Sequence, residues 1–162
     1  MDSKLYLAHN IDQKTLRAGN ARAVTNNVFI VDFNPPFPLM ENPFIAAQFI
    51  YASLTEGNFS LIGRIPLPEI FTQFSFVFPC SIEDGTHQIG SDSVRSSIFI
   101  SHAGIIHLEK GEITLKRDKV QNTLEAIFSV YIKYRHDLGE EVEYHAEGRV
   151  FVNATGPLCA ES

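Results

Sequence analysis

The sequence predicts an all-β fold, either a single antiparallel β-barrel or a two-sheet β-sandwich of about eight strands. Apolar and polar residues alternate with a period of two along most of the chain, whereas the 3.6-residue period of helices is nearly absent. Hydrophobic residues make up 44% of the chain and charged residues 20%, which is enough for a core under a wettable surface. With 162 residues, the chain has the size of one ordinary domain.

The segments 126–135 and 142–152 give the clearest indication of a hairpin. Each segment has one apolar face, and placing Tyr134 opposite Val142 brings both faces to the same side. The loop is then Asp137-Leu138-Gly139, with glycine at the left-handed position that three-residue loops require. The same register predicts the cross-strand pairs Lys133–Glu143, Arg135–Glu141, Tyr131–His145, Ser129–Glu147 and Ile127–Arg149.

The segment 106–115 indicates a second hairpin, because apolar residues alternate on both sides of Lys110-Gly111. The expected pairs are Leu108–Ile113 and Ile106–Leu115. Consecutive hairpins from residue 104 onward favour a meander, and a meander favours a barrel over a sandwich.

Five earlier segments complete the expected strands: 28–33, 44–54, 60–65, 71–82 and 94–101. The segment 44–54 could also form helical turns, but Tyr51, Thr55 and Gly57 favour a strand. Prolines between Asn34 and Leu39 exclude a central strand there, and we interpret that segment as a stiff connection. We expect residues 1–23 to form an N-terminal arm or edge strand, 24–155 the β domain and 156–162 a flexible tail.

The charge and the apolar pattern argue against two classes of partner. Lysine and arginine total 13 against 19 aspartate and glutamate residues, and an acidic domain repels nucleic acid phosphates. No apolar run reaches the length of a membrane-spanning helix. The first ten residues lack the apolar stretch of a secretory signal, so we expect a cytoplasmic protein or export by another route. The two cysteines allow one disulfide, but nothing in their spacing demands it. Cys80 is expected to be a small buried hydrophobe and Cys159 to lie in the tail.

Two groups of residues are candidates for a binding site. If the sheet closes as a barrel, a set of inward aromatic residues fills its interior or lines a cavity for an apolar ligand: Phe74, Phe76, Phe78, Phe128, Tyr134 and Tyr144. The register of the long hairpin also gathers a polar set on the opposite face: Tyr131, His145, Glu147 and Arg149. A solvated surface whose charges neutralise one another is the simpler interpretation of this second set.

Motifs for chemistry are missing. None of the six histidines stands at a familiar zinc spacing, and no phosphate loop or nucleophile elbow occurs. We therefore predict no metal, no cofactor and no catalytic residue from the sequence.

Three functions remain open at this point. The first is a non-enzymatic domain that holds a small apolar or amphipathic ligand in a barrel cavity. The second is a protein-interaction or assembly module with a filled core, which recruits partners through the proline loop or a strand edge, where a homo-oligomer could form. The third is a barrel-type isomerase or cyclase in which one tyrosine or histidine moves a proton, with Tyr134 and Tyr144 as the tyrosines to test. A hollow interior favours the first and third, and a packed interior favours the second.

Overall fold

The computed structural model describes residues 8–9, 27–66, 71–90, 94–101, 103–135 and 139–159. The eleven elements given bounds within these residues are all β-strands, and their pairing in both sheets is antiparallel. The all-β prediction is confirmed, with more strands than the expected eight or so. No helix within the described part of the chain is long and apolar enough to cross a membrane.

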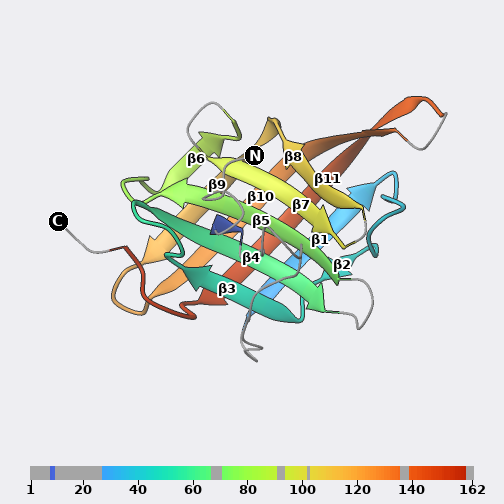
Figure 1. Ribbon diagram of the computed structural model, residues 1–162. Coiled ribbons are helices and arrows are strands. Elements are labelled where there is room, and N and C mark those ends of the chain that lie inside the picture. Colours follow the sequence, from blue (N-terminus) through green and yellow to red (C-terminus); the bar gives the residue numbers. More distant parts are fainter. Residues whose placement is uncertain are drawn as a thin grey trace.

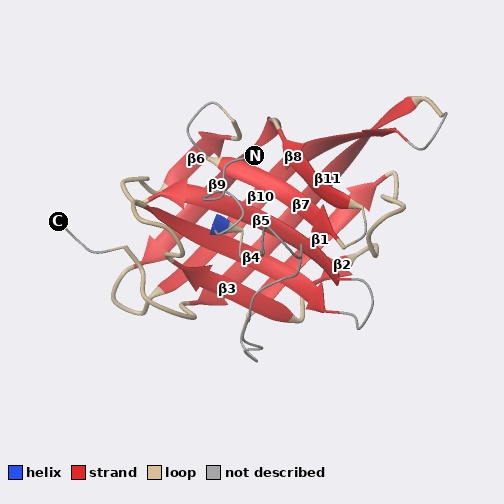
Figure 2. Cartoon of the chain, viewed as in Figure 1, coloured by secondary structure: helices blue, strands red, loops and turns tan. Residues whose placement is uncertain are grey.

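The strands form two sheets that lie one behind the other, with their strands crossing in the view of Figure 1. The six-stranded sheet has the order β2 (Phe44–Ile45), β1 (Val28–Asn34), β11 (Glu141–Asn153), β10 (Thr123–Arg135), β9 (Lys110–Asp118) and β6 (Gly85–Gln88). The five-stranded sheet has the order β3 (Gln48–Ala52), β4 (Asn58–Pro66), β5 (Phe71–Pro79), β7 (Arg95–Ile100) and β8 (Gly104–Leu108). Strands dominate every layer of the molecule in Figure 2.

The register predicted for the long hairpin is confirmed. β10 and β11 pair with Tyr134 opposite Val142 and Lys133 opposite Glu143. The other predicted pairs are also present: Arg135–Glu141, Tyr131–His145, Ser129–Glu147 and Ile127–Arg149. Shifting one strand by one residue would turn the buried Val130 and Ile132 toward water, which explains why the pattern specifies this register.

The hairpin predicted for residues 106–115 is wrong. β8 pairs with β7 in the five-stranded sheet, whereas β9 pairs with β10 and β6 in the six-stranded sheet. Leu108 therefore lies opposite Ser96, and Ile113 lies opposite Phe128. The chain crosses between the sheets at Glu109. The apolar positions on both sides of the crossing match because both strands face one core from opposite sheets.

A second crossing divides the predicted strand 44–54 into β2 and β3. Ala46 donates its backbone N–H to Phe29 of the six-stranded sheet, and the next residue, Ala47, donates to Arg64 of the five-stranded sheet. The strand interpretation of this segment is correct, and the helical alternative is not observed.

The core lies between the sheets and is rich in phenylalanine. Phe29 and Phe128 come from the six-stranded sheet and meet Phe74 of the five-stranded sheet, with ring centroids 6.2 and 5.1 Å from that of Phe74. Gly148 leaves room for this arrangement, because a β-carbon at that position would overlap the ring of Phe128. Core packing and backbone spacing therefore depend on each other at this point.

A disulfide joins Cys80, after β5, to Cys159 near the end of the chain. The expectation of a lone buried Cys80 is wrong, since cysteines 79 residues apart cannot be matched from spacing alone. The segment before Cys159 is also bonded, because the carbonyl of Pro157 accepts the backbone N–H of Ser53 at 2.8 Å.

Candidate functional site

The aromatic residues predicted to line a cavity lie between the sheets and contact one another. Phe76 and Phe128 have ring centroids 4.8 Å apart, and Phe78 stacks on Phe59 at 5.0 Å. Rings at such distances are in van der Waals contact, as in a packed core. Phe74, Phe76 and Phe78 on β5 have no exposed surface.

The two tyrosines of the predicted set lie further along the long hairpin. Both Tyr134 and Tyr144 contact Phe37, with ring centroids 5.6 and 5.0 Å from it. Phe37 belongs to the proline-rich connection after β1 and is only 1% exposed. This connection therefore packs its aromatic side chain into the core.

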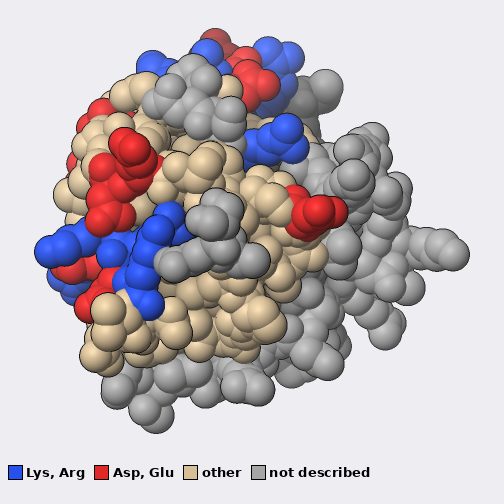
Figure 3. Space-filling view, turned by 90° about the vertical axis from the view of Figure 1, so that its left-hand side faces the viewer, with Lys and Arg blue, Asp and Glu red and all other residues tan. Residues whose placement is uncertain are grey.

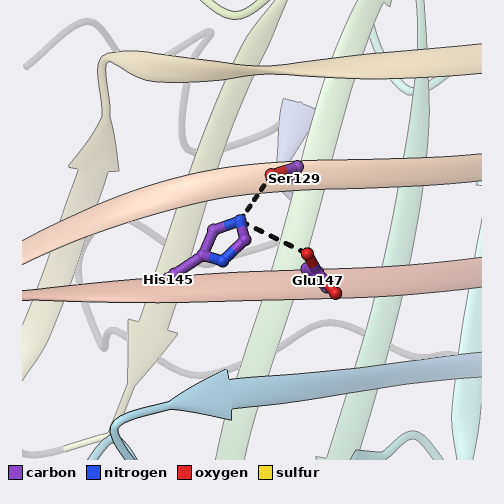
Figure 4. A network of polar contacts seen from close by, with 3 residues as sticks. All are labelled: Ser129, His145 and Glu147. Atoms are coloured by element: carbon purple, nitrogen blue, oxygen red, sulfur yellow. Dashed lines mark hydrogen bonds and ion pairs between the residues drawn. The ribbon is translucent and has the colours of Figure 1, made fainter.

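The structure brings together most of the polar set predicted on β10 and β11. A hydrogen bond of 2.5 Å joins Ser129 Oγ and His145 Nε2, and Glu147 Oε1 lies 3.8 Å from the same nitrogen (Figure 4). The Tyr131 ring stacks on His145 at 4.8 Å, and Lys110 Nζ lies 4.5 Å from the Tyr131 centroid.

This arrangement differs from a catalytic triad in one decisive respect. In a triad the acid orients the imidazole through the nitrogen opposite the one that contacts the serine. Here Ser129 and Glu147 both approach Nε2 of His145 (Figure 4). The Glu147 side chain is also 70% exposed. The geometry is that of a hydrogen-bonded surface network.

Arg149, the fourth member of the polar set, lies among apolar residues. Its cross-strand neighbours are Ile30 on β1 and Ile127 on β10. Ile45 on β2 pairs with Ile30. Phe151, two residues after Arg149 on β11, pairs with Val28. We call these apolar residues the outer-face patch: Val28, Ile30, Ile45, Ile127 and Phe151.

The outer-face patch is exposed to solvent on the side of the six-stranded sheet that faces away from the core. Ile127 is 62% exposed and Ile45 56%, while Val28 and Phe151 are each close to 40%. Single exposed apolar residues are ordinary, whereas a contiguous group of them on one face of a sheet is less common.

The opposite outer face, on the five-stranded sheet, is covered in part by Ala8 and His9. Both residues are buried. Gln73 Nε2 donates to the His9 carbonyl at 2.6 Å, and Ser60 donates to the carbonyl of Ala8. Arg64, itself 2% exposed, donates from Nε and Nη2 to Gln73 Oε1 at 2.9 and 2.7 Å. Burial lowers the pKa of Arg64 to about 10.

The ring of His9 lies between two serines. Its Nδ1 is hydrogen-bonded to Ser75 and lies 3.2 Å from Ser97 Oγ. Burial lowers the pKa of His9 to about 4, and the nearby His107 and Arg95 add to this shift. The serine and imidazole could in principle act as nucleophile and base, but all three side chains are inaccessible to substrate. The hydrogen bonds of these side chains hold His9 against the outer face of the five-stranded sheet.

A cleft opens at the end of the molecule where the disulfide lies. Figure 3 views the molecule from the left-hand side of Figure 1, and acidic and basic side chains lie next to one another on part of this surface. Its volume is about 1270 Å³. We call it the end cleft; its lining residues include Tyr51, Ile82, Asp84, Arg117, Leu158 and the disulfide.

Sequence reasoning missed the end cleft, the disulfide and the residues around His9. The cleft and the disulfide join distant segments, so no local pattern indicates them. A signal for the His9 contacts does exist: Ser60, Ser75 and Ser97 are polar residues at outward positions on three neighbouring strands of one sheet.

Comparison with known proteins found no matching family model, no matching curated protein and no matching solved structure. Within the described residues, no group of three His, Cys, Asp or Glu side chains could hold a metal ion.

Proposed function

We propose that this chain is a protein-assembly module that pairs with a second copy of itself through the outer-face patch. The supporting observation is that exposed apolar residues lie at paired positions of adjacent strands, so they form one contiguous group on the outer face of the sheet. The ring contacts between the sheets support a filled core, and a filled two-sheet sandwich leaves its outer surfaces to carry function. The contact involves a sheet face, in contrast to the strand edge expected from the sequence.

The charges around the patch favour a second copy as the occupant. Arg149 lies at the centre of the patch, while Glu125 and Glu147 flank it on neighbouring rows of the sheet. A surface with a central cation and peripheral carboxylates is self-complementary, because a second copy can set its Arg149 against these carboxylates. Symmetric pairing of one patch is also the commonest form of homo-oligomer.

The test compares two substitutions that place a carboxylate at exposed apolar positions. Ile127→Glu lies within the patch, and Val120→Glu lies in the β9–β10 turn, where Val120 is 87% exposed. Sedimentation equilibrium should show that Ile127→Glu weakens self-association by about tenfold or more, because pairing would desolvate the new charge. Val120→Glu should associate like the wild type.

Two outcomes would overturn the proposal. One is a wild-type chain that remains monomeric at concentrations up to the millimolar range. The other is equal weakening by both substitutions, which would mean that added charge acts without regard to position.

We further infer that the chain works in an oxidising compartment. Disulfides form and persist in such compartments and are rare in the cytosol. The Cys80–Cys159 bond supports this inference over the cytoplasmic location expected from the N-terminus. Fractionation of the source cells, followed by alkylation of free thiols, tests it: cytosolic protein with two alkylated cysteines would refute it.

A further inference from the structure

We propose that the end cleft binds a small amphipathic carboxylate, a molecule with an apolar body and one carboxylate group. The cleft shares no residue with the outer-face patch, so this binding is independent of self-association. Its volume of about 1270 Å³ is large enough for a ligand, since small-molecule sites commonly span roughly 300–1,000 Å³.

Part of the lining of the end cleft is apolar. Ile82 and Leu158 form this part together with the ring of Tyr51 and the Cys80–Cys159 disulfide. Leu158 is half-buried, and the disulfide fixes its neighbour in the chain. An alkyl or aryl body can therefore exchange water for contact with these side chains.

Arg117 is the anchor for the carboxylate. Its guanidinium lies 4.7 Å from the centroid of the Phe59 ring, and its Nη2 donates to the carbonyl of Ile82 at 2.9 Å. These contacts hold the side chain in place before any ligand arrives. Its Nε is buried and has no hydrogen-bond acceptor in the described part of the chain. A planar guanidinium held in one orientation matches the geometry of a carboxylate, which makes arginine a common carboxylate-binding residue in proteins.

The acidic residues of the cleft are partly engaged by the backbone. Asp84 Oδ1 accepts the backbone N–H of Arg117 at 3.0 Å. Asp118 Oδ1 accepts those of Val120 and Gln121, both at 2.9 Å. These hydrogen bonds fix the orientation of the two carboxylates against the backbone. Glu83 also lines the cleft, so its three carboxylates balance the three cations Lys116, Arg117 and Lys119. An anion is therefore bound through directed hydrogen bonds to Arg117, and net charge contributes little.

Tyr51 supplies a hydroxyl donor beside this anchor. Burial raises the pKa of Tyr51, and the opposing effect of Arg117 is smaller. The hydroxyl is therefore protonated at neutral pH and can donate to an oxygen of the ligand.

The experiment uses the fluorescent carboxylate 11-(dansylamino)undecanoic acid and the full-length oxidised chain. We expect saturable fluorescence enhancement that decanoate displaces and that decylamine does not. The methyl ester of the probe should bind about tenfold more weakly, because it loses charge-assisted hydrogen bonds to Arg117. Absence of saturable binding, or equal binding of the acid and the ester, would overturn the proposal.

Two substitutions locate the site. Arg117→Gln should weaken probe binding by about tenfold, the scale of a charge-assisted hydrogen bond. Because this change also removes the contact with Phe59, Ser81→Trp provides a second variant: Ser81 is exposed and lines the cleft, so tryptophan can block the cleft without entering the core. Its control is Ala103→Trp on the exposed β7–β8 turn. Probe binding by Ser81→Trp at the level of Ala103→Trp would place the carboxylate elsewhere and refute the proposal.

The patch variant Ile127→Glu separates this proposal from the proposed function. It should bind the probe like the wild type even when self-association is lost. Loss of probe binding in this variant would contradict an independent site in the end cleft.

Discussion

The ring of Phe128 on β10 lies against the α-carbon of Gly148, its direct partner on β11. A β-carbon on residue 148 would overlap the ring, which also contacts Phe74 and Phe76 from the opposite sheet. The distance between the sheets at this point therefore depends on a missing methyl group.

Gly148→Ala should lower the free energy of unfolding by about 1–3 kcal/mol, because an added methyl in a packed core forces neighbours to shift. Chemical denaturation measures the loss. Combining it with Phe128→Leu should cost less than the sum of the two single changes, since the smaller side chain makes room. Additive losses would show that Gly148 is not in steric conflict with Phe128.

Removing the disulfide should destabilise the chain by about 4 kcal/mol, the loop-closure estimate for cysteines 79 residues apart. The measurement is urea denaturation of the oxidised wild type and of the Cys80→Ser, Cys159→Ser double variant. Reductant should lower the stability of the wild type alone. A wild type that is indifferent to reductant would contradict the contribution assigned to this bond.

Stability should fall in mildly acidic solution because of His9. Its pKa is about 4 in the folded chain and 6.5 when exposed, so below pH 6.5 the unfolded chain binds a proton that the folded chain excludes. The loss should grow to about 3 kcal/mol as the pH falls to 4, and then stop. Groups that face the ring, His107, Arg95, Ser75 and Ser97, set this environment.

The measurement for His9 is the stability difference between the wild type and His9→Gln from pH 7 to pH 4. Taking the difference removes the carboxylates that titrate in both proteins. The free energy of unfolding of the wild type should decrease relative to that of the variant as the pH falls. A difference that stays constant across this range would mean that His9 is exposed or already charged.

The surface pair Lys133–Glu143 offers a test of the register itself. Lys133→Glu places two carboxylates opposite each other and should cost about 0.5 kcal/mol, the scale of a cross-strand charge pair. Adding Glu143→Lys restores opposite charges and should recover most of the loss. The readout is thermal denaturation at low salt, with high salt as the control that screens both effects.

Much of the fold could be predicted because alternation is a local property. The register of β10 and β11 follows from their apolar faces and from the loop between them, all within 30 or so residues. Assignment of strands to sheets could not be predicted in the same way. Ile113 and Leu108 point to one core whether their strands pair or face each other across it, so the pattern around Gly111 is equally consistent with a hairpin and a crossing.

The candidate sites also differ in whether they follow from local register or from the order of strands in a sheet. The polar set Tyr131, His145 and Glu147 was predicted because cross-strand neighbours follow from register. The same register placed Arg149 beside Ile127, but the patch also needs β1 next to β11 and β2 next to β1, which the sequence does not indicate.

By itself, the sequence determined that the chain forms antiparallel strands, which face of each long strand is buried, and how β10 meets β11. These depend on neighbouring side chains and on the two-residue period of a strand. Tertiary structure alone decided where the chain changes sheets, that Cys80 meets Cys159, and that His9 is buried on serines from distant strands. Such contacts depend on how complete sheets pack against each other, and a local pattern of residue types does not predict this packing.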